Sequence, residues 1–369
     1  MFKTLLKGAQ RLATGSDARS PTDLFPKVTP AVDGDDCLHD CASCSISYPK
    51  GFKIDESDEL YGHVKGWATH ILVATGKSDW VRDVADEKGS VMQAIEAADK
   101  PTNGRLMLSA SNIPTPHHTS DYAEPTTVLL LPAFTIVENV SPATVPHLLS
   151  AYIDKAPTNT SALTPVFSSL PRALPPPADL PSSAPPSLHT LTSRPSPHAA
   201  LVLLCSQRTR DARCGQSAPL LRKELERHLR PLGLYRDLDD QRPGGVGVYF
   251  ISHTGGHKYS ANMMVYRRPD AFGVDDVERA HLGPGEVLMP RNKTKTTPAA
   301  HAESNGADAS HNKTDDDDDV GAAQCIWLAR VKPEDIEGIV KYTVLQGKVV
   351  KPESQLRGGF DRSRGVMSW

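Results

Sequence analysis

The chain has 369 residues, which is enough for two domains and a linker. Its 41 lysines and arginines against 44 acidic residues give a net charge of −3, so the charge makes no general case for nucleic acid as a partner. No run of about 18 apolar residues occurs, and no membrane span is expected. Aromatic residues make up 6% and prolines number 31, so part of the chain is expected to lie outside a packed core.

The N-terminal stretch MFKTLLKGAQRLATGS has no acidic residue before Asp17. Its apolar residues share one helical face, and its lysines and arginine lie elsewhere on the helix. This pattern is typical of a mitochondrial presequence, and a frayed amphipathic start fits it equally well. We expect residues 1–59 to form an irregular N-terminal segment.

Within that segment, CLHDCASC holds Cys37, Cys41 and Cys44. In a chain of this length without a secretory signal, clustered cysteines favour metal binding or redox chemistry over a disulfide scaffold. A zinc site completed by His39 or His63, part of a metal cluster, a redox disulfide and inert surface thiols all stay open.

Strands and helices alternate over residues 60–156. THILVATG (69–76), GRLMLSAS and TTVLLLPAF are predicted strands, and residues 78–99 are a predicted helix that Gly89 interrupts. SPATVPHLLSAYID has the period of a short helix with Ser141 as its cap. This alternation predicts an α/β domain.

Residues 157–198 are dominated by proline, serine and threonine, which predicts a semi-extended linker. A second α/β unit is expected over 199–350. AALVLLC (199–205) is a predicted strand that runs into a cysteine, residues 217–234 form an amphipathic helix, and VGVYFISH (246–253) is a strand that runs into a histidine.

Two further strands are predicted, SANMMVYRR (260–268) and CIWLARV (325–331), and a last helix begins at Pro333. Residues 284–322 read as an acidic disordered insertion, and 351–369 as a C-terminal tail. The order β-α-β-β-β-α is compatible with a thioredoxin-like sheet. The predicted fold is therefore α/β, with two thioredoxin-like domains joined by the proline-rich linker.

Two pairs of metal-ligand side chains follow the strands of the second unit. Cys205 and Cys214 flank one loop, and His253 and His257 flank another. If the strands that precede Cys205 and His253 run parallel, both residues leave the sheet at the same edge. We therefore expect two thiols and two imidazoles to converge.

The intervening Gly255 and Gly256 lack side chains, so the backbone can approach a bulky inorganic group and direct its N–H groups toward it. Zinc accepts two cysteines and two histidines, but the spacer between Cys205 and Cys214 is wide for one tetrahedral ion. A [2Fe–2S] cluster with two cysteines on one iron and two histidines on the other suits the division better. A core thiol at Cys205 with histidines in a turn is the alternative.

The chain resembles the sucrase/ferredoxin-like family, the fungal thioredoxin-like ferredoxins of the altered-inheritance-of-mitochondria and actin-patches-distal type. The resemblance implies a non-Rieske [2Fe–2S] cluster held by two cysteines and two histidines, here Cys205, Cys214, His253 and His257. It is carried by the motifs LCSQRTRDARCG (204–215), GLYRD (233–237), ISHTGGHKYSANMMVY (251–266) and IWLARV (326–331).

The expected function is one-electron transfer, since no motif indicates a substrate-converting enzyme. Neutral imidazoles in place of two thiolates raise the reduction potential of the cluster. The second nitrogen of each imidazole can carry a proton, so we hypothesise that electron transfer is coupled to proton transfer. The partner would be a redox protein of unknown identity. A thiol–disulfide oxidoreductase on the same scaffold and a zinc-stabilised interaction module are the alternatives.

The chain ends in Met367, Ser368 and Trp369. This ending is similar to the tripeptide by which some cytosolic iron–sulfur proteins engage the cytosolic assembly targeting complex. On a flexible tail, such a tryptophan and carboxylate would form an anchor. The ending favours the cytoplasm, and the presequence-like start leaves the mitochondrion as the alternative.

Overall fold

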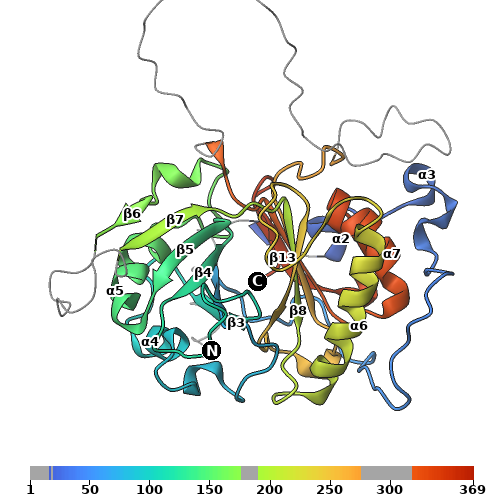
Figure 1. Cartoon of the computed structure of the whole chain (residues 1–369). Helices are drawn as coiled ribbons and strands as arrows, with labels where there is room; N and C mark the ends of the chain where they lie inside the picture. Colours follow the sequence, from blue (N-terminus) through green and yellow to red (C-terminus); the bar gives the residue numbers. More distant parts are fainter. Residues whose placement is uncertain (1–15, 18–19, 176–189, 276–317) are drawn as a thin grey trace, which may run out of the picture.

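The computed structural model describes residues 16–17, 20–175, 190–275 and 318–369. These residues form a mixed α/β fold around one large mixed sheet (Figure 1). The presequence-like stretch, the middle of the proline-rich stretch and most of the acidic insertion lie outside the described residues, which exclude 1–15, 176–189 and 276–317.

In the N-terminal half of the sheet, β2 runs parallel to β3 and antiparallel to β4, which in turn pairs with β5. The strand order is therefore β3-β2-β4-β5, and β7 and β6 extend the edge beyond β5. The bounds are β2 (Thr69–Ala74), β3 (Leu106–Ser111), β4 (Thr126–Leu131), β5 (Thr135–Val140), β6 (Ala173–Leu174) and β7 (Leu191–Pro195).

The C-terminal half repeats this order. Here β8 runs parallel to β10 and antiparallel to β11, which pairs with β12, so the order is β10-β8-β11-β12. The two halves join where Ile251 of β10 faces Ser111 of β3. The bounds are β8 (Ala200–Cys205), β9 (Tyr235–Arg236), β10 (Val246–Ile251), β11 (Met263–Arg267), β12 (Gln324–Leu328), β13 (Leu356–Asp361), β14 (Val366–Met367) and β1 (Ser16–Asp17).

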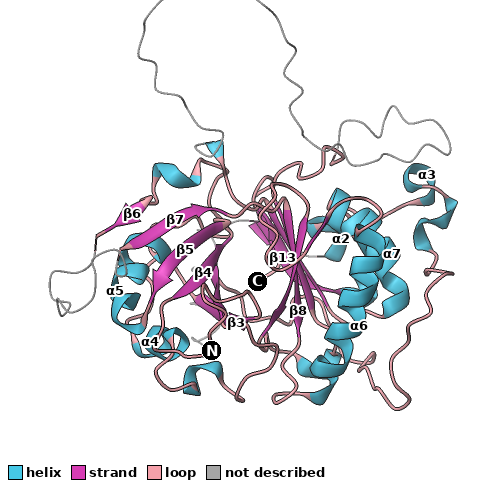
Figure 2. Ribbon diagram, viewed as in Figure 1, coloured by secondary structure: helices cyan, strands magenta, loops and turns pink. Residues whose placement is uncertain are grey.

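The longer helices cover the outer faces of the two half-sheets, and the strands lie between them (Figure 2). On the N-terminal side lie η3 (Val84–Asp86), α4 (Val91–Ala97), η4 (Pro142–Thr144), α5 (Val145–His147), η5 (Leu148–Ile153) and η6 (Val166–Ser168). The remaining helices are α2 (Pro21–Leu24), α3 (Pro30–Asp33), η2 (Asp35–Leu38), α6 (Ala212–Leu229), η8 (His257–Tyr259), η11 (Pro333–Asp335), α7 (Ile336–Gly338), η12 (Ile339–Val344) and α8 (Pro352–Gln355).

Strand periodicity divides the core into layers. On β8, Val202 and Leu204 face the helix layer of α6, while Leu201 and Leu203 point to the opposite face. That opposite face packs against Leu72 and other side chains of the N-terminal half-sheet, so the two half-sheets share one apolar layer. The order of layers is helices, sheet, sheet, helices.

Most predicted strands are confirmed, and several boundaries are wrong. The helix expected over 78–99 is only η3 and α4, because Gly89 adopts a positive φ of 71° before the cap at Ser90. The stretch TTVLLLPAF is one strand, β4, followed by a turn into β5. Helix α6 begins at Ala212 rather than at 217.

Two segments expected outside the domains contribute strands. Residues 157–198 contain β6 and β7, and β7 pairs with β5 along four residues from Glu138↔Thr192 to Thr135↔Pro195. Residues 351–369 contain β13 and β14, which continue the sheet beyond β12. Among the described residues, we find no helix with the length and apolar character that a membrane crossing requires.

Candidate metal centre

Cys205 and His253 leave the sheet at the same edge. Cys205 is the last residue of β8 and lies opposite Ile251, the last residue of the parallel strand β10. His253 follows two residues later, and its backbone N–H donates to Oε1 of Gln207 at 2.9 Å. The parallel pairing expected from the sequence is confirmed, and it brings both side chains to one place.

Cys214 reaches this place from the first turn of α6. Asp211 caps the helix by accepting from the N–H of Arg213 at 2.9 Å, and the N–H of Cys214 donates to the carbonyl of Asp211 at 3.0 Å. The helix N-terminus carries a partial positive charge, which favours negative charge on the sulfurs that lie beside it. The earlier start of α6 is therefore what gives Cys214 its position.

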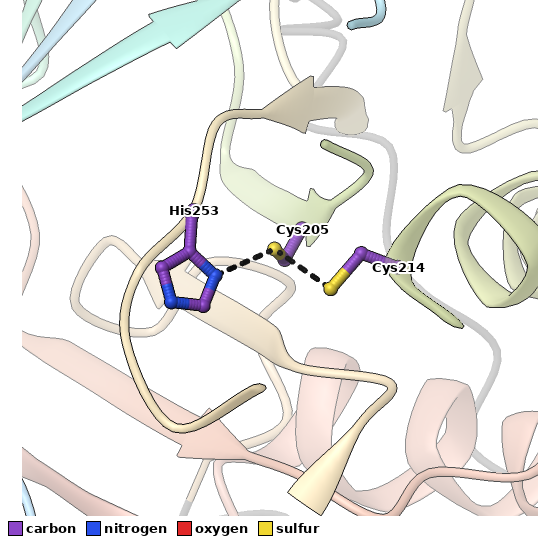
Figure 3. A group of neighbouring side chains, drawn as sticks. All are labelled: Cys205, Cys214 and His253. Carbon is purple, nitrogen blue, oxygen red and sulfur yellow. Dashed lines mark hydrogen bonds between the residues drawn. The ribbon is translucent and has the colours of Figure 1, made fainter. Parts of the chain in front are cut away.

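The three side chains converge (Figure 3). The sulfurs of Cys205 and Cys214 lie 3.4 Å apart, and Nδ1 of His253 lies 4.0 Å from the sulfur of Cys205. The two thiols are 2% and 0% exposed and are not in disulfides, while His253 is half-buried. All three ligand atoms lie within 4.8 Å of one another, close enough to share a metal group.

The pKa values of the two thiols are shifted in opposite directions. Their mutual hydrogen bond, opposed by burial, lowers the pKa of Cys205 to about 5. The same hydrogen bond and burial raise the pKa of Cys214. One anionic sulfur is thus already favoured beside the other thiol, and a bound cation would favour the second.

The fourth expected ligand, His257, has a described backbone at the start of η8, but its side chain lies outside the described residues. Its role as a ligand stays a prediction. The short segment between His253 and His257 turns back toward β11 through Gly255 and Gly256, whose φ angles are 86° and 67°. An L side chain rarely adopts this left-handed conformation.

Arg357 of β13 fixes the loop of Gly255 and Gly256 by hydrogen bonds. Its guanidinium donates to the carbonyl of Gly255 at 3.0 Å and to Oδ1 of Asn262 at 2.7 Å. A Cβ on Gly256 would lie 2.4 Å from Nη2 of Arg357, so the glycine makes room for this cation. The sequence indicated that the two glycines leave space for an inorganic group, but at Gly256 the space is taken by Arg357, which no residue pattern near the motif indicates.

Gln207 is a second residue that the sequence analysis missed. Its Oε1 accepts from His253, and its Nε2 donates to the carbonyl of Val81, so it connects the His253 loop to the N-terminal half. The hydroxyl of Ser206 makes a similar link, donating to the carbonyl of Ser78 at 2.7 Å. The site is therefore fixed by both halves of the sheet.

The donor set fits a transition-metal group. Two thiols and an imidazole are ligands that zinc and iron–sulfur clusters prefer, whereas magnesium and calcium prefer oxygen. Burial of both sulfurs suits a group that must be kept from water. Among the described residues, Cys205, Cys214 and His253 could hold such a group, and a [2Fe–2S] cluster would need a further ligand.

The cysteines of the N-terminal cluster lie apart from this site, and Cys37 has different neighbours from Cys41. Cys37 is 1% exposed in an apolar cluster with Tyr342 and Val350. Cys41 lies beside His228 of α6, with Nε2 3.9 Å from its sulfur. The histidines proposed to complete a site pair with carboxylates instead: His39 with Asp36 at 3.2 Å, and His63 with Glu59 at 3.1 Å.

The C-terminal residues pack against the fold. The ring of Trp369 stacks on Trp67 with centroids 4.3 Å apart, and Oγ of Ser368 accepts from the N–H of Gly359 at 2.9 Å. Met367 belongs to β14. The expectation of a flexible tail is therefore wrong for this structure, and a targeting role for Met367, Ser368 and Trp369 stays a prediction.

The fold and site define a class: a mixed α/β protein with a buried cysteine–histidine group at the edge of its sheet. The chain belongs to the sucrase/ferredoxin-like family, whose model matches residues 60–358. This is the family that the motifs around the cysteines and histidines resembled.

Several curated fungal proteins are similar to the chain. Actin patches distal protein 1 of Saccharomyces cerevisiae is 27% identical over 281 residues, covering 71% of this chain and 81% of that protein. Altered inheritance of mitochondria protein 32 of Clavispora lusitaniae is 28% identical over 169 residues, or 44% of this chain and 39% of that protein. The same-named protein of Debaryomyces hansenii is 28% identical over 151 residues, covering 41% of this chain and 33% of that protein. No solved structure matches the chain significantly.

Proposed function

We propose that this protein is a one-electron carrier with a [2Fe–2S] cluster held by Cys205, Cys214, His253 and His257. The observation that carries the proposal is the convergence of three of these side chains from distant segments, with two buried sulfurs 3.4 Å apart. Membership in a ferredoxin-like family supports it.

The bound cluster would supply a reversible one-electron change. The protein supplies two thiolates in place of the four of a plant-type ferredoxin, and this smaller negative charge raises the reduction potential. Arg357 adds positive charge beside the glycine loop. Burial lowers the pKa of Arg357 to about 10, so it is still charged at neutral pH. The proton coupling expected from the imidazoles stays a prediction.

A redox partner would approach where the site nears the surface. His253 is half-buried, and the loop before Cys214 carries the exposed Arg208 and the partly exposed Arg210. Arg213 is engaged locally, since its guanidinium pairs with Asp211 at 2.8 Å. We propose an acidic redox protein as the partner, attracted by Arg208 and Arg210.

The finer fold assignment also belongs to this proposal. Each half has a parallel β-α-β unit followed by two antiparallel strands and a helix, with the strand order two-one-three-four. This repeated order supports two thioredoxin-like units over 60–156 and 199–350. The cytoplasm remains the proposed location and the mitochondrion the alternative, toward which the names of two relatives point.

The proposal is tested by anaerobic purification of the full-length chain with quantification of iron and acid-labile sulfide. We expect about two of each per chain. Single substitutions C205S, C214S, H253A and H257A should each reduce the iron content severalfold. C325A is the matched control, because Cys325 is a buried thiol of β12 outside the site. Stoichiometric zinc without iron would favour the interaction module, and a metal-free protein with a Cys205–Cys214 disulfide would favour the oxidoreductase.

A further inference from the structure

We propose that Cys41 and Cys44 form a thiol–disulfide exchange site that reacts with low-molecular-weight disulfides. Cys41 is the attacking sulfur, and Cys44 resolves the mixed disulfide. The site lies beside the C-terminal end of α6, whereas the candidate metal centre includes Cys214 at the other end of this helix. It does not depend on the metal centre being occupied.

The backbone brings the two cysteines together. The sequence Cys41-Ala42-Ser43-Cys44 forms a turn in which the N–H of Cys44 donates to the carbonyl of Cys41 at 3.3 Å. The ends of a turn of this kind lie within about 7 Å between Cα atoms, which overlaps the span of a disulfide. Neither residue is in a disulfide. We infer that a rotation of the side chains can join them.

Two basic side chains of α6, Arg227 and His228, lie beside the sulfur of Cys41. Nη2 of Arg227 donates to the sulfur of Cys41 at 3.3 Å, and Nε2 of His228 lies 3.9 Å away. A guanidinium beside a thiol stabilises the thiolate, which is the nucleophile in disulfide exchange. Cys44 accepts no hydrogen bond from a guanidinium in the described contacts: its S–H donates to the carbonyl of Ile46 at 3.3 Å, and burial raises its pKa despite the nearby charge of Arg227. This difference assigns the attacking role to Cys41.

The same contacts argue against a metal ion here. Cys41, His228 and Glu337 place ligand atoms within 4.8 Å of one another. However, Nη2 of Arg227 lies among them, 2.9 Å from Nε2 of His228 and 2.7 Å from Oε2 of Glu224. Because a guanidinium already supplies positive charge among these ligand atoms, a metal cation would be repelled there. The cluster therefore suits thiol chemistry better than metal binding.

Access and attachment fit the exchange reaction. Cys44 is partly exposed, and Cys41 is 8% exposed, so a small disulfide has a route to the pair. The N–H of Cys41 donates to the carbonyl of Glu334 at 3.0 Å, which fixes the turn against the helical layer. Cys37 is packed among apolar side chains instead, and this leaves a pair rather than a trio.

The reaction balances with the small disulfide as oxidant. The Cys41 thiolate attacks one sulfur of the disulfide RSSR, forms a mixed disulfide and releases RS⁻, which takes up the proton that Cys41 lost. Cys44 then loses its proton and attacks the Cys41 sulfur, and the second RS⁻ leaves and takes up that proton. The protein dithiol is oxidised by two electrons, and RSSR is reduced to two RSH.

The test treats the full-length protein with oxidised glutathione, blocks free thiols with N-ethylmaleimide and cleaves before aspartates. Cleavage before Asp40 separates Cys37 from the pair, so mass spectrometry reads Cys41 and Cys44 alone. We expect a Cys41–Cys44 disulfide that dithiothreitol reverses, glutathione trapped on Cys41 in C44S, and no trapping in C41S. C37A is the matched control and should behave as the wild type.

The role of Arg227 has its own readout. R227Q should slow trapping on Cys41 in the C44S background about tenfold, because a charge-assisted hydrogen bond to the thiolate is lost, and R227K should restore part of the rate. Circular dichroism checks the fold of each variant. Three results would overturn the proposal. They are glutathione trapped on Cys44 in C41S as fast as on Cys41 in C44S, a Cys41–Cys44 pair that oxidised glutathione leaves reduced, and zinc that blocks both thiols until a chelator removes it. Iron content reports on the metal centre separately and should be unchanged in C41S and C44S.

Discussion

Arg357 determines the shape of the loop between the two candidate histidine ligands. It contacts the carbonyl of Gly255 from a position 102 residues later in the chain. The side chain is 2% exposed and lies over the ring of Trp327, with its guanidinium carbon 4.1 Å from the centroid. In the described contacts, its guanidinium donates to neutral carbonyl and amide oxygens and not to a carboxylate. Its positive charge is therefore not neutralised by an anion beside the site.

The two glycines of the loop should respond differently to alanine. G255A adds only the cost of a left-handed backbone, roughly 1 kcal/mol, because no atom lies within 4 Å of its Cβ. G256A also displaces Arg357 and should cost about 2–4 kcal/mol. Urea unfolding of both variants measures the difference. Equal free energies of unfolding would contradict the role of Arg357.

At this scale, the sequence predicted the residues whose side chains are metal ligands and missed the polar residues that position them. Cys205, Cys214 and His253 follow from strand ends and spacing, and the structure brings them together. Arg357 and Gln207 are ordinary polar residues in the sequence, and only the packing of distant strands places them beside His253 or its loop. Arg357 lies outside the quoted motifs, and Gln207 lies within one but is not a metal-ligand residue type.

Among the elements, α6 matters most for the candidate site, because its first turn carries Cys214. The amphipathic pattern of the sequence predicted a helix that begins at residue 217, after Gly215 and with Pro219 in its first turn. The structure accommodates both: α6 continues through Pro219, and Gly215 lets Arg208 approach, with Cβ of Arg208 2.5 Å from where a glycine Cβ would be. Asp211 supplies the cap that the prediction lacked.

Replacing the cap should therefore destabilise α6. D211A removes the acceptor for the N–H of Arg213 and should lower the free energy of unfolding by about 1 kcal/mol. D211N keeps a capping oxygen and should cost less, although it loses the ion pair with Arg213. Urea unfolding compares the two. A D211N protein as destabilised as D211A would contradict the capping role.

The unpredicted strands have a common cause. The sequence of β7, LTSRP, lacks a run of apolar residues that would predict a strand. It is extended because it pairs with β5. Likewise, β13 is placed by its pairing with β12, and β14 by its pairing with β13. Edge strands of this kind are defined by tertiary pairing rather than by local propensity.

In the whole molecule, the two half-sheets share an apolar layer that contains a buried histidine. Nδ1 of His70 lies 3.0 Å from the hydroxyl of Tyr266 in the C-terminal half, and Nε2 lies 2.9 Å from Oγ of Ser109 in its own half. Burial lowers the pKa of His70 to about 3 from 6.5. Burial also raises the pKa of Tyr266 and of nearby Cys325, so these groups stay neutral too.

The neutral state of His70 predicts a dependence of stability on pH. The unfolded chain takes up the proton first, so the contribution of His70 is complete above pH 6.5 and is lost as the pH falls toward about 3. The loss is about 1.4 kcal/mol per pH unit within that window. Urea unfolding of the wild type and of H70Q measures it. The same pH dependence in both proteins would contradict this account.

The repeated strand order could be anticipated only in part. Alternating strands and helices predicted two α/β units, but a proline-rich stretch between them suggested separate bodies. The structure instead joins the halves through β3 and β10 and through the shared layer. The sequences of β2 and β8 are apolar on both faces, and this pattern was the available signal that both faces are covered. A strand with one face in water would alternate apolar with polar residues.

The most direct test of the central claim is electron paramagnetic resonance of the full-length protein, purified without oxygen and reduced with dithionite. Our account predicts a paramagnetic signal from a reduced [2Fe–2S] cluster, with H257C retaining a cluster but changing its signal and lowering its midpoint potential. A reduced protein that gives no such signal and contains no iron would contradict the claim that Cys205, Cys214, His253 and His257 hold a cluster.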